Sequence, residues 1–553
     1  MSLKMRSIFV PILFLVFLAT EATAQQPEAW ADYDETKDLA LLAEHDNERM
    51  RFDLLLSRVR DRNSIWQYFE TALEAFGPAR YQNLKPLILE RSVYDLQAAV
   101  ALGLLTYTDL TTFYLYRIRE IETDPERFLN AVISLDPAAI ERARALDARR
   151  TAGEIIALDS LFGIPVLLKD NIGAAGIPTT AGAVALAENL SEDAFITARL
   201  RESGAVILGK ANLSEWAYFF CRSCPSGYSA LGGQTLNPYG RFEFGTGGSS
   251  SGSGAAAATN MAAVTVGTET SGSILSPSSA SSIVGLKPST GALSRSGIVP
   301  ISATLDTAGP MTRSVQDAVV LFNAMAGFDS EDTAMSRRSE DFRLVNRETD
   351  IDGWRLGALE NHLDNSLFKE ALARLTADGA IAVEVTLPDV DTEGFTKFLG
   401  AEMLRDLALY LNIYAANEVG VDSISALRRF NEQEPYLRAP YGQQLIDMMV
   451  ELELDSVELE ALRMRLQTAA RSALDSLFSD ESLKVLLSIN NSNASLAALA
   501  NYPALTVPLG YEEDGRAVGI TIIAPSFQEQ TLIDLGLRFE KLIRARRLPA
   551  AYR

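Results

Sequence analysis

The sequence predicts an α/β fold in which short buried strands form a central sheet and helices cover it. Short apolar runs typical of buried strands recur at 163–171, 205–210, 283–288, 504–510 and 518–524. Segments with helical periodicity separate them, at 314–325, 367–375, 457–477 and 531–544. The hydrophobic content of 47% over 553 residues supports one large core.

The same patterns divide the chain into regions. Residues 25–150 are mostly helical in periodicity, with a short β-like run at 128–133, and we expect them to pack on the core. Residues 151–553 carry the strands and form that core. Helical patterns dominate about 355–487, which predicts an inserted helical cover. Between strands and helices, we expect loops at 297–300 and 306–311.

Residues 1–24 have the pattern of a signal peptide. Lys4 and Arg6 form a basic start, and residues 8–19 form an apolar run that is too short to span a membrane as a helix. The small residues Ala22 and Ala24 then match a cleavage pattern. We therefore expect an exported chain, periplasmic or secreted, that is cleaved after Ala24 and has no stable membrane insertion afterwards.

Charge and motif content exclude several classes of function. A net charge of −22 and a pI near 4.7 argue against binding to nucleic acid or to anionic membrane surfaces. The glycine-rich segment after Gly245 lacks the Lys-Ser/Thr pair of a phosphate-binding loop. The same segment matches only about half of the dinucleotide-binding fingerprint. With only two histidines in the chain, no histidine-based mononuclear zinc site can form. We expect no cofactor and no metal.

The only cysteines, Cys221 and Cys224, have C-x-x-C spacing. This spacing occurs in redox pairs and in zinc sites, but a second pair of metal ligands is missing here. In an exported chain, a local disulfide with a structural role is the expected state.

The stretch from Gly245 to Pro277 is the strongest candidate for a functional site. It is rich in glycine and serine, yet an alanine-rich segment and a β-branched run divide it into loop, helix, strand and loop. A helix of about 11 residues rises roughly 16 Å, and a return strand of about five residues covers roughly the same distance. The two loops should therefore meet at one edge of the sheet, which places Ser249 near Ser273.

A serine nucleophile needs an adjacent base, and the scarcity of histidine directs the search to lysine. Lys169 lies at the end of the apolar run 163–171, where ligand sites of α/β sheets are found. Burial can lower the pKa of such a lysine far enough for it to act as a base. Lys210 ends the next predicted strand and is a competitor for this role. The glycine-flanked turn 270–273 can offer consecutive backbone N–H groups to an oxyanion, so the set suits acyl transfer.

Two other functions are compatible with the same segment. Gly248 to Gly252 fits the G-x-S-x-G nucleophile elbow centred on Ser250, with His362 as the base, which predicts an esterase of the α/β-hydrolase type. The third hypothesis is an exported solute-binding protein whose Gly/Ser loop only holds a ligand.

Several blocks of the sequence strongly resemble the amidase signature family. The first two are the Gly247–Ser253 block, GGSSSGS, and the Gly267–Ile274 block, GTETSGSI, with GIPVLLKDN ending at Asn171 upstream. Further matches occur at Asn212–Trp216, 232–235, 285–288 and 306–313. The resemblance covers about residues 92–524, and GTETSGSI with the IVPIS motif at 298–302 looks most like bacterial peptide amidases, which remove the C-terminal amide of peptides.

The resemblance implies a three-layer α/β/α fold with a central mixed, twisted sheet. It also implies a Ser-Ser-Lys triad with Ser273 as the nucleophile, Ser249 as the bridging serine on a cis peptide bond, and Lys169 as the base. The backbone of Thr270, Ser271, Gly272 and Ser273 would line the oxyanion hole. The expected activity is metal-independent hydrolysis of carboxylic amides through an acyl-enzyme, on small-molecule or peptide substrates.

One position departs from the pattern of many family members, which carry arginine two residues after the nucleophile. This chain has Leu275 there. Peptide-amidase-like members also lack the arginine. The departure affects the transfer of substrate preferences from arginine-bearing relatives. Pocket residues are expected from the helical region around 401–441, where the family motifs do not reach.

Overall fold

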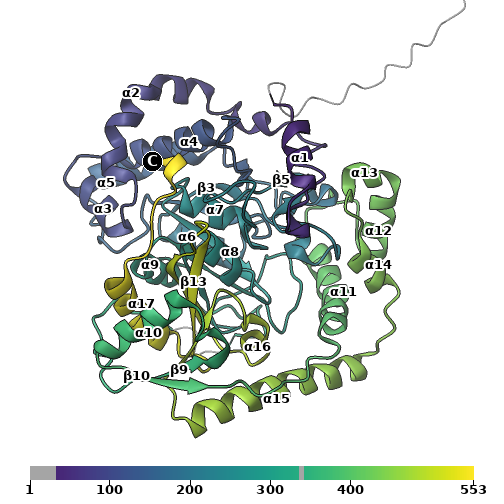
Figure 1. The fold of residues 1–553 in the computed structure, drawn as a ribbon. Helices are drawn as coiled ribbons and strands as arrows, with labels where there is room; N and C mark the ends of the chain where they lie inside the picture. Colours follow the sequence, from purple (N-terminus) through teal and green to yellow (C-terminus); the bar gives the residue numbers. More distant parts are fainter. Residues whose placement is uncertain (1–32, 336–341) are drawn as a thin grey trace, which may run out of the picture.

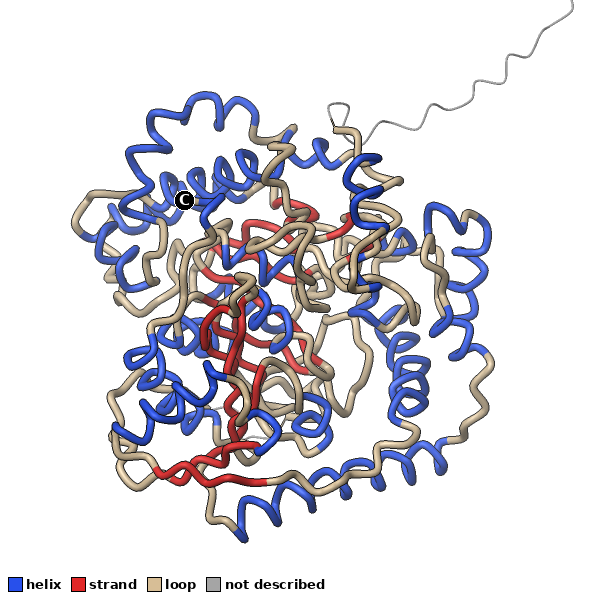
Figure 2. The backbone as a smooth tube through the Cα atoms, in the orientation of Figure 1, coloured by secondary structure: helices blue, strands red, loops and turns tan. Residues whose placement is uncertain are grey.

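A mixed sheet of 11 strands runs through the centre of the structure (Figures 1 and 2). The computed structural model describes residues 33–335 and 342–553, so the predicted signal peptide 1–24 lies outside the described residues. The strands follow the order β1-β3-β2-β6-β8-β7-β12-β13-β11-β9-β10. Pairs β3–β2, β2–β6, β11–β9 and β9–β10 are parallel, and the other neighbours are antiparallel.

The strands of the sheet are short and almost all buried. They are β1 Val132–Leu135, β2 Pro165–Lys169, β3 Val206–Ala211, β6 Val264–Glu269, β7 Val284–Lys287, β8 Thr307–Thr312, β9 Arg355–Leu359, β10 Ile381–Val385, β11 Val485–Ile489, β12 Ala504–Tyr511 and β13 Ala517–Ile523. A separate two-stranded ribbon pairs β4 Tyr228–Ser229 with β5 Gly233–Gln234. The five apolar runs at 163–171, 205–210, 283–288, 504–510 and 518–524 are thus confirmed as strands.

Helices form three groups. The N-terminal group is α1 Thr36–Ala43, α2 Glu70–Ile88, α3 Val93–Ala101, α4 Tyr107–Glu122 and α5 Ala139–Thr151. Helices of the core are α6 Phe195–Glu202, α7 Ser251–Ala258, α8 Leu275–Ala280, α9 Val315–Met325, α10 Ser366–Ala377, α16 Ala494–Leu499 and α17 Glu529–Ile543. The remaining group is α11 Phe395–Ile413, α12 Ile424–Gln433, α13 Pro435–Arg438, α14 Gln444–Val450 and α15 Ser456–Asp480. Among the described residues, no helix combines the length and apolar character needed to cross a membrane.

Two consecutive residues of β12 show that helices cover both faces of the sheet. Leu505 lies against Gly536 of α17. The next residue, Thr506, and Ser279 of α8 both approach Gly519 of β13 from one side of the sheet. Successive side chains of a strand point to opposite faces, so α17 and α8 occupy opposite layers. Helices α9 and α10 pack with α17, and α7 packs with α8. The predicted three-layer α/β/α architecture is confirmed.

The segment 355–487 contains more than a helical cover. It opens with β9 and β10, which extend the sheet beyond β11 as parallel strands, and α10 lies between them. The helical cover itself is α11 to α15, at 395–480, drawn in green along one side and the base of the molecule in Figure 1. The N-terminal region is mainly helical, and its strand β1 forms one edge of the sheet beside β3.

The expectation of a loop at 306–311 is wrong, because Thr307–Thr312 is β8, a central strand between β6 and β7. Its sequence, TAGPMT, contains a glycine and a proline, which are rare inside central strands. Pro310 pairs with Val266 and Gly309 with Gly267. A side chain at Gly309 would collide with the carbonyl oxygen of Leu286 in β7, so this strand depends on a small residue for close backbone approach.

We expect Gly309→Ala to destabilise the fold, because the added methyl group forces the neighbouring backbone to move. Overpacking of this kind lowers the free energy of unfolding by about 1–3 kcal/mol, which a shift of the denaturant midpoint would report. Gly420→Ala is the control, since Gly420 is exposed with no atom within 4 Å of an added Cβ. Equal midpoints for the two variants would contradict the close-approach role of Gly309.

Candidate active site

Lys169 lies at the carboxyl end of β2, beside the end of the parallel strand β6. Its side chain is fully buried. The Nζ atom lies 2.8 Å from Ser249 Oγ, 2.9 Å from Thr268 Oγ1 and 3.1 Å from the Thr268 carbonyl oxygen. The parallel pairing of two strands therefore holds the amine against both a serine of the Gly/Ser loop and Thr268 near the end of β6.

The two loops of the Gly/Ser stretch meet as their lengths predict. The backbone N–H of Ser250 donates to the carbonyl oxygen of Ser273 at 3.2 Å. Ser249 is fully buried, and the Gly248–Ser249 peptide bond is cis, as the resemblance implies. Ser273 is half-buried and lines a pocket open to solvent. The structure thus brings Lys169, Ser249 and Ser273 to one edge of the sheet.

Burial lowers the pKa of Lys169 to about 7, because the ammonium form loses its hydration inside the protein. The carboxylates of Asp306 and Glu269 act in the opposite direction and raise this pKa. A lysine with this pKa is neutral in about half of the molecules near pH 7, and the neutral form can accept a proton there.

The competing lysine, Lys210, is placed differently. Its Nζ donates to the carbonyl oxygen of Ile172 at 2.5 Å and to Thr179 Oγ1 at 3.1 Å, and it lies 3.6 Å from the carboxylate of Asp170. Burial lowers the pKa of Lys210 to about 8, while the Asp170 carboxylate raises it. None of these partners is a serine of the Gly/Ser stretch, so Lys169 is the lysine that contacts it.

The turn Thr270–Ser273 joins the end of β6 to α8. Gly272 has a φ of +96°, a conformation that other residues rarely adopt. The Glu269 carboxylate accepts the N–H groups of Ile274 at 2.7 Å and Leu275 at 3.0 Å, which fixes the far end of the turn. Within the described part of the chain, no backbone carbonyl accepts the N–H of Ser271, Gly272 or Ser273.

Asp306 holds this turn from the side. Its carboxylate accepts the Thr270 hydroxyl at 2.5 Å and the N–H groups of Ile301 at 2.8 Å and Ser302 at 2.9 Å. Burial raises the pKa of Asp306 to about 6, so the carboxylate is charged near neutral pH. Asp306 opens the motif that the resemblance already included, but nothing in the sequence indicated its contact with Thr270.

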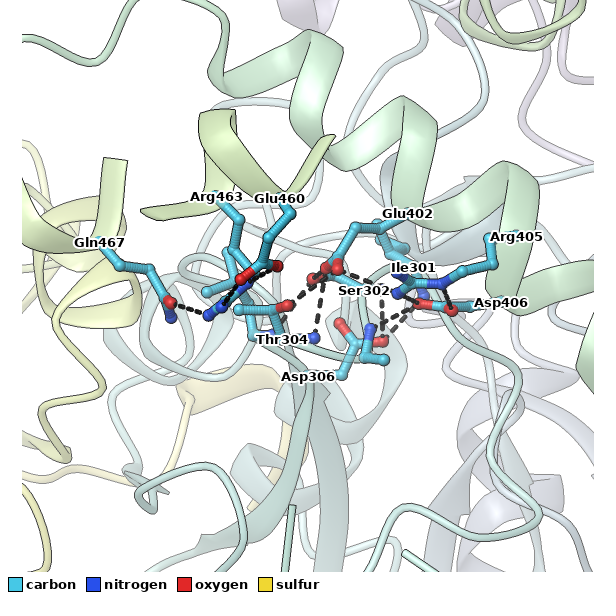
Figure 3. Close-up of polar contacts among 12 residues, drawn as sticks. Ile301, Ser302, Thr304, Asp306, Glu402, Arg405, Asp406, Glu460, Arg463 and Gln467 are labelled. Carbon is cyan, nitrogen blue, oxygen red and sulfur yellow. Dashed lines mark hydrogen bonds and ion pairs between the residues drawn. The ribbon is translucent and has the colours of Figure 1, made fainter. Parts of the chain in front are cut away.

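The helical cover fastens the loop that carries Asp306 (Figure 3). Glu402 of α11 accepts hydrogen bonds from the Ser302 hydroxyl and the Thr304 hydroxyl, and Asp406 accepts the Ala303 N–H at 2.7 Å. Arg405 pairs with both acidic side chains. The chain of contacts runs from α11 through loop 301–306 to the turn at Thr270. No local sequence pattern predicts this connection, because Glu402 and Asp406 lie about 100 residues from the loop that they contact.

The pocket at Ser273 has a volume of about 400 Å³. Its walls come from the Gly/Ser loop, the 270–273 turn, α8, the segment around Asn490 and the N-terminal segment 47–52. Residues 401–441, where pocket residues were expected, do not line it. From that region, Tyr441 supports a wall instead, because its hydroxyl accepts the N–H groups of Asp53 at 2.8 Å and Leu54 at 3.2 Å.

The Ser250–His362 pair is not assembled. Ser250 is fully buried, and its hydroxyl donates to the Thr268 carbonyl oxygen at 3.0 Å. His362 contacts Ser488 at 3.2 Å, on a different strand. Cys221 and Cys224 form the expected disulfide. Across residues 33–335 and 342–553, no group of three His, Cys, Asp or Glu side chains is arranged to hold a metal ion.

Comparison with known proteins identifies the family. The family model described as Amidase matches residues 109–533. A probable amidase of Arabidopsis thaliana is 36% identical over 479 residues, 84% of this chain and 92% of the relative. An amidase family protein from Bacillus anthracis has a TM-score of 0.84 and 35% identity, covering 88% of this chain and 98% of that one. The peptide amidase of Stenotrophomonas maltophilia is 37% identical with a TM-score of 0.78, covering 83% of this chain and 98% of that protein. The chain belongs to the amidase signature family and is an enzyme that hydrolyses amide bonds.

Proposed function

We propose that the enzyme cleaves amides with a triad in which Ser273 is the nucleophile, Ser249 relays protons and Lys169 is the base. The observation that carries this proposal is the 2.8 Å contact between the buried Lys169 amine and Ser249 Oγ, next to a half-buried Ser273. The three partners of Nζ suit a neutral amine. Its two hydrogens can go to the Thr268 carbonyl and hydroxyl oxygens, and its lone pair can accept the Ser249 hydroxyl proton.

The first half-reaction follows from this arrangement. Lys169 takes the Ser249 proton while Ser249 takes the Ser273 proton, and Ser273 Oγ attacks the amide carbonyl carbon. The backbone N–H groups of 270–273 face the developing oxyanion and stabilise it. Collapse of the tetrahedral intermediate breaks the C–N bond, and the proton returns from Lys169 through Ser249 to the leaving nitrogen. The amine or ammonia departs and leaves an acyl ester on Ser273.

The second half-reaction uses the same relay, with water as the nucleophile and Ser273 as the leaving group. Neutral Lys169, through Ser249, removes a proton from a water molecule, which attacks the acyl ester. The carboxylic acid departs as the Ser273 hydroxyl regains its proton through the relay. No cofactor takes part in any step of this proposal.

We further propose that the substrates are C-terminal amides of peptides. Support comes from the likeness to the Stenotrophomonas maltophilia peptide amidase and from a pocket of about 400 Å³ that is open to solvent. A panel of amidated peptides, aryl amides and fatty amides tests this directly. Faster release of ammonia from the peptides than from the other amides is expected, and the reverse order would exclude peptide amides as the main substrate.

Export is the final part of the proposal, because the signal-peptide pattern at 1–24 is followed by a disulfide-bonded pair, which is typical of oxidising compartments. We expect expression in a bacterial host to yield a mature chain that begins at Gln25, as measured by mass spectrometry of the intact protein. Ala24→Asp should block this cleavage. A full-length cytoplasmic product from the unmodified sequence would contradict export.

Replacement of each triad residue should abolish turnover without unfolding the protein. We expect Ser273→Ala and Lys169→Met to lower kcat/KM by at least about 10³-fold, and Ser249→Ala to have a comparable effect, because the three residues act as one unit. His362→Ala is the control and should stay within about twofold. Retention of activity in Lys169→Met together with its loss in His362→Ala would overturn the lysine-base assignment.

Activity should rise with pH through a limb centred near pH 7. Only neutral Lys169 accepts a proton, and its pKa of about 7 sets the midpoint. Asp306→Asn removes a charge that raises this pKa, so the limb of kcat/KM should move to lower pH. Asp352→Asn, at an exposed site, should leave the midpoint unchanged. A midpoint that does not move in Asp306→Asn would show that another group titrates.

A further inference from the structure

One wall of the pocket at Ser273 comes from the N-terminal segment 47–52, which precedes the residues 109–533 that the family shares. Asn47 caps a short 3-10 helix, Glu48–Met50, by accepting the Arg49 N–H at 3.1 Å. Met50 and Phe52 are buried. Two side chains of this wall are therefore packed into the protein interior.

The next residues anchor the wall. The Glu35 carboxylate accepts the N–H groups of Leu55 at 3.1 Å and Leu56 at 3.0 Å. Tyr441 accepts those of Asp53 and Leu54 on the other side. Backbone contacts with two distant elements therefore hold the chain directly after segment 47–52, which keeps the backbone of that segment at the pocket.

The charge of the pocket is opposite to that of the chain. The chain has 72 acidic and 50 basic residues, yet the described residues that line this pocket include two arginines, Arg49 and Arg516, and no Asp or Glu. Most other polar lining residues carry side-chain amides or hydroxyls. A cavity lined with donors and positive charge favours an anionic group of a ligand.

The two arginines differ in how they are paired. Arg516 forms an ion pair of 2.9 Å with Asp514, an exposed neighbour. The guanidinium of Arg49 has no ion pair or hydrogen bond with any described residue. Burial raises the pKa of the Tyr218 hydroxyl, and the positive charge of Arg49 acts in the opposite direction; Tyr218 lines the same pocket. Arg49 therefore has free donors within electrostatic reach of the pocket interior.

We propose that Arg49 is a specificity-determining residue that binds a carboxylate on the substrate, so that the enzyme prefers acidic amides. This inference rests on the proposed function, in which Ser273 at the same pocket is the nucleophile. When a C-terminal peptide amide is cleaved, the leaving group is ammonia. The carboxylate that Arg49 recognises therefore belongs to the acyl part, as an acidic side chain near the scissile amide.

The test compares N-acetylated peptide amides that differ only by Glu or Gln at the last, second-last or third-last position. The wild-type enzyme should prefer the Glu member at one of these positions by about tenfold in kcat/KM, the effect of one charge-assisted hydrogen bond partly open to water. Arg49→Gln should reduce this preference to within about twofold. Arg49→Lys should keep part of the preference for Glu, because it keeps the positive charge. Added salt should weaken the preference of the wild-type enzyme.

Arg51→Gln is the matched control. Arg51 lies two residues away and carries the same charge, but it pairs with Glu48 at 3.7 Å and does not line the pocket. Its replacement should leave the Glu preference intact. Equal rates on every Glu and Gln pair, or a preference that survives in Arg49→Gln and disappears in Arg516→Gln, would overturn the assignment to Arg49.

The same measurements separate this inference from the proposed function. Hydrolysis of Gln peptides that Ser273→Ala abolishes supports the proposed function whatever the Glu preference. If no peptide amide is cleaved, a pair of anilides, one neutral and one bearing a carboxylate, is used instead. The ratio of their kcat/KM values then measures the preference for the acidic substrate. A preference for the acidic anilide that depends on Arg49 would keep the inference and reject the peptide substrate, whereas no preference would reject both.

Discussion

The burial of one lysine amine at the ends of two parallel strands is the constraint on which the rest of the site depends. Strands β2 and β6 pair in parallel, so their carboxyl ends meet and Lys169 reaches Thr268 without leaving the core. Burial of a charged amine costs free energy of solvation, and this cost lowers the pKa of Lys169 to about 7. The fold thereby gives this amine a pKa close to neutral, and the Gly/Ser loop contacts it through Ser249.

The predictions from sequence were most accurate where hydrophobicity or chain length determined the outcome. The apolar runs became strands, and matching the lengths of the helix and the return strand brought Ser249 and Ser273 together. The scarcity of histidine points to lysine, and the structure places Lys169, not Lys210, against Ser249. The strands and the meeting of the two loops are predicted correctly, because each depends on the pattern of one continuous stretch of the chain.

The remaining features depend on contacts between distant segments. Strand β8 was missed because its glycine and proline are typical of loops, and only the close neighbours β6 and β7 make a small residue necessary there. No local motif predicts that Asp306 contacts Thr270 or that Glu402 contacts loop 301–306. The wall at 47–52 lies more than 200 residues from Ser273, so no spacing rule could place it.

Tyr441 has a consequence for how the pocket can respond to large substrates. Its hydroxyl holds the N-terminal segment, its carbonyl oxygen accepts the Ser223 hydroxyl at 3.3 Å, and its ring meets Tyr228 edge-on at 4.8 Å. Two segments from separate regions of the chain, 53–54 and 223–228, are thus joined at one residue of the helical cover. Both segments adjoin pocket walls, one through residues 47–52 and the other through Tyr218 and Ser226. Outward movement of either wall therefore strains contacts with the same tyrosine that holds the other.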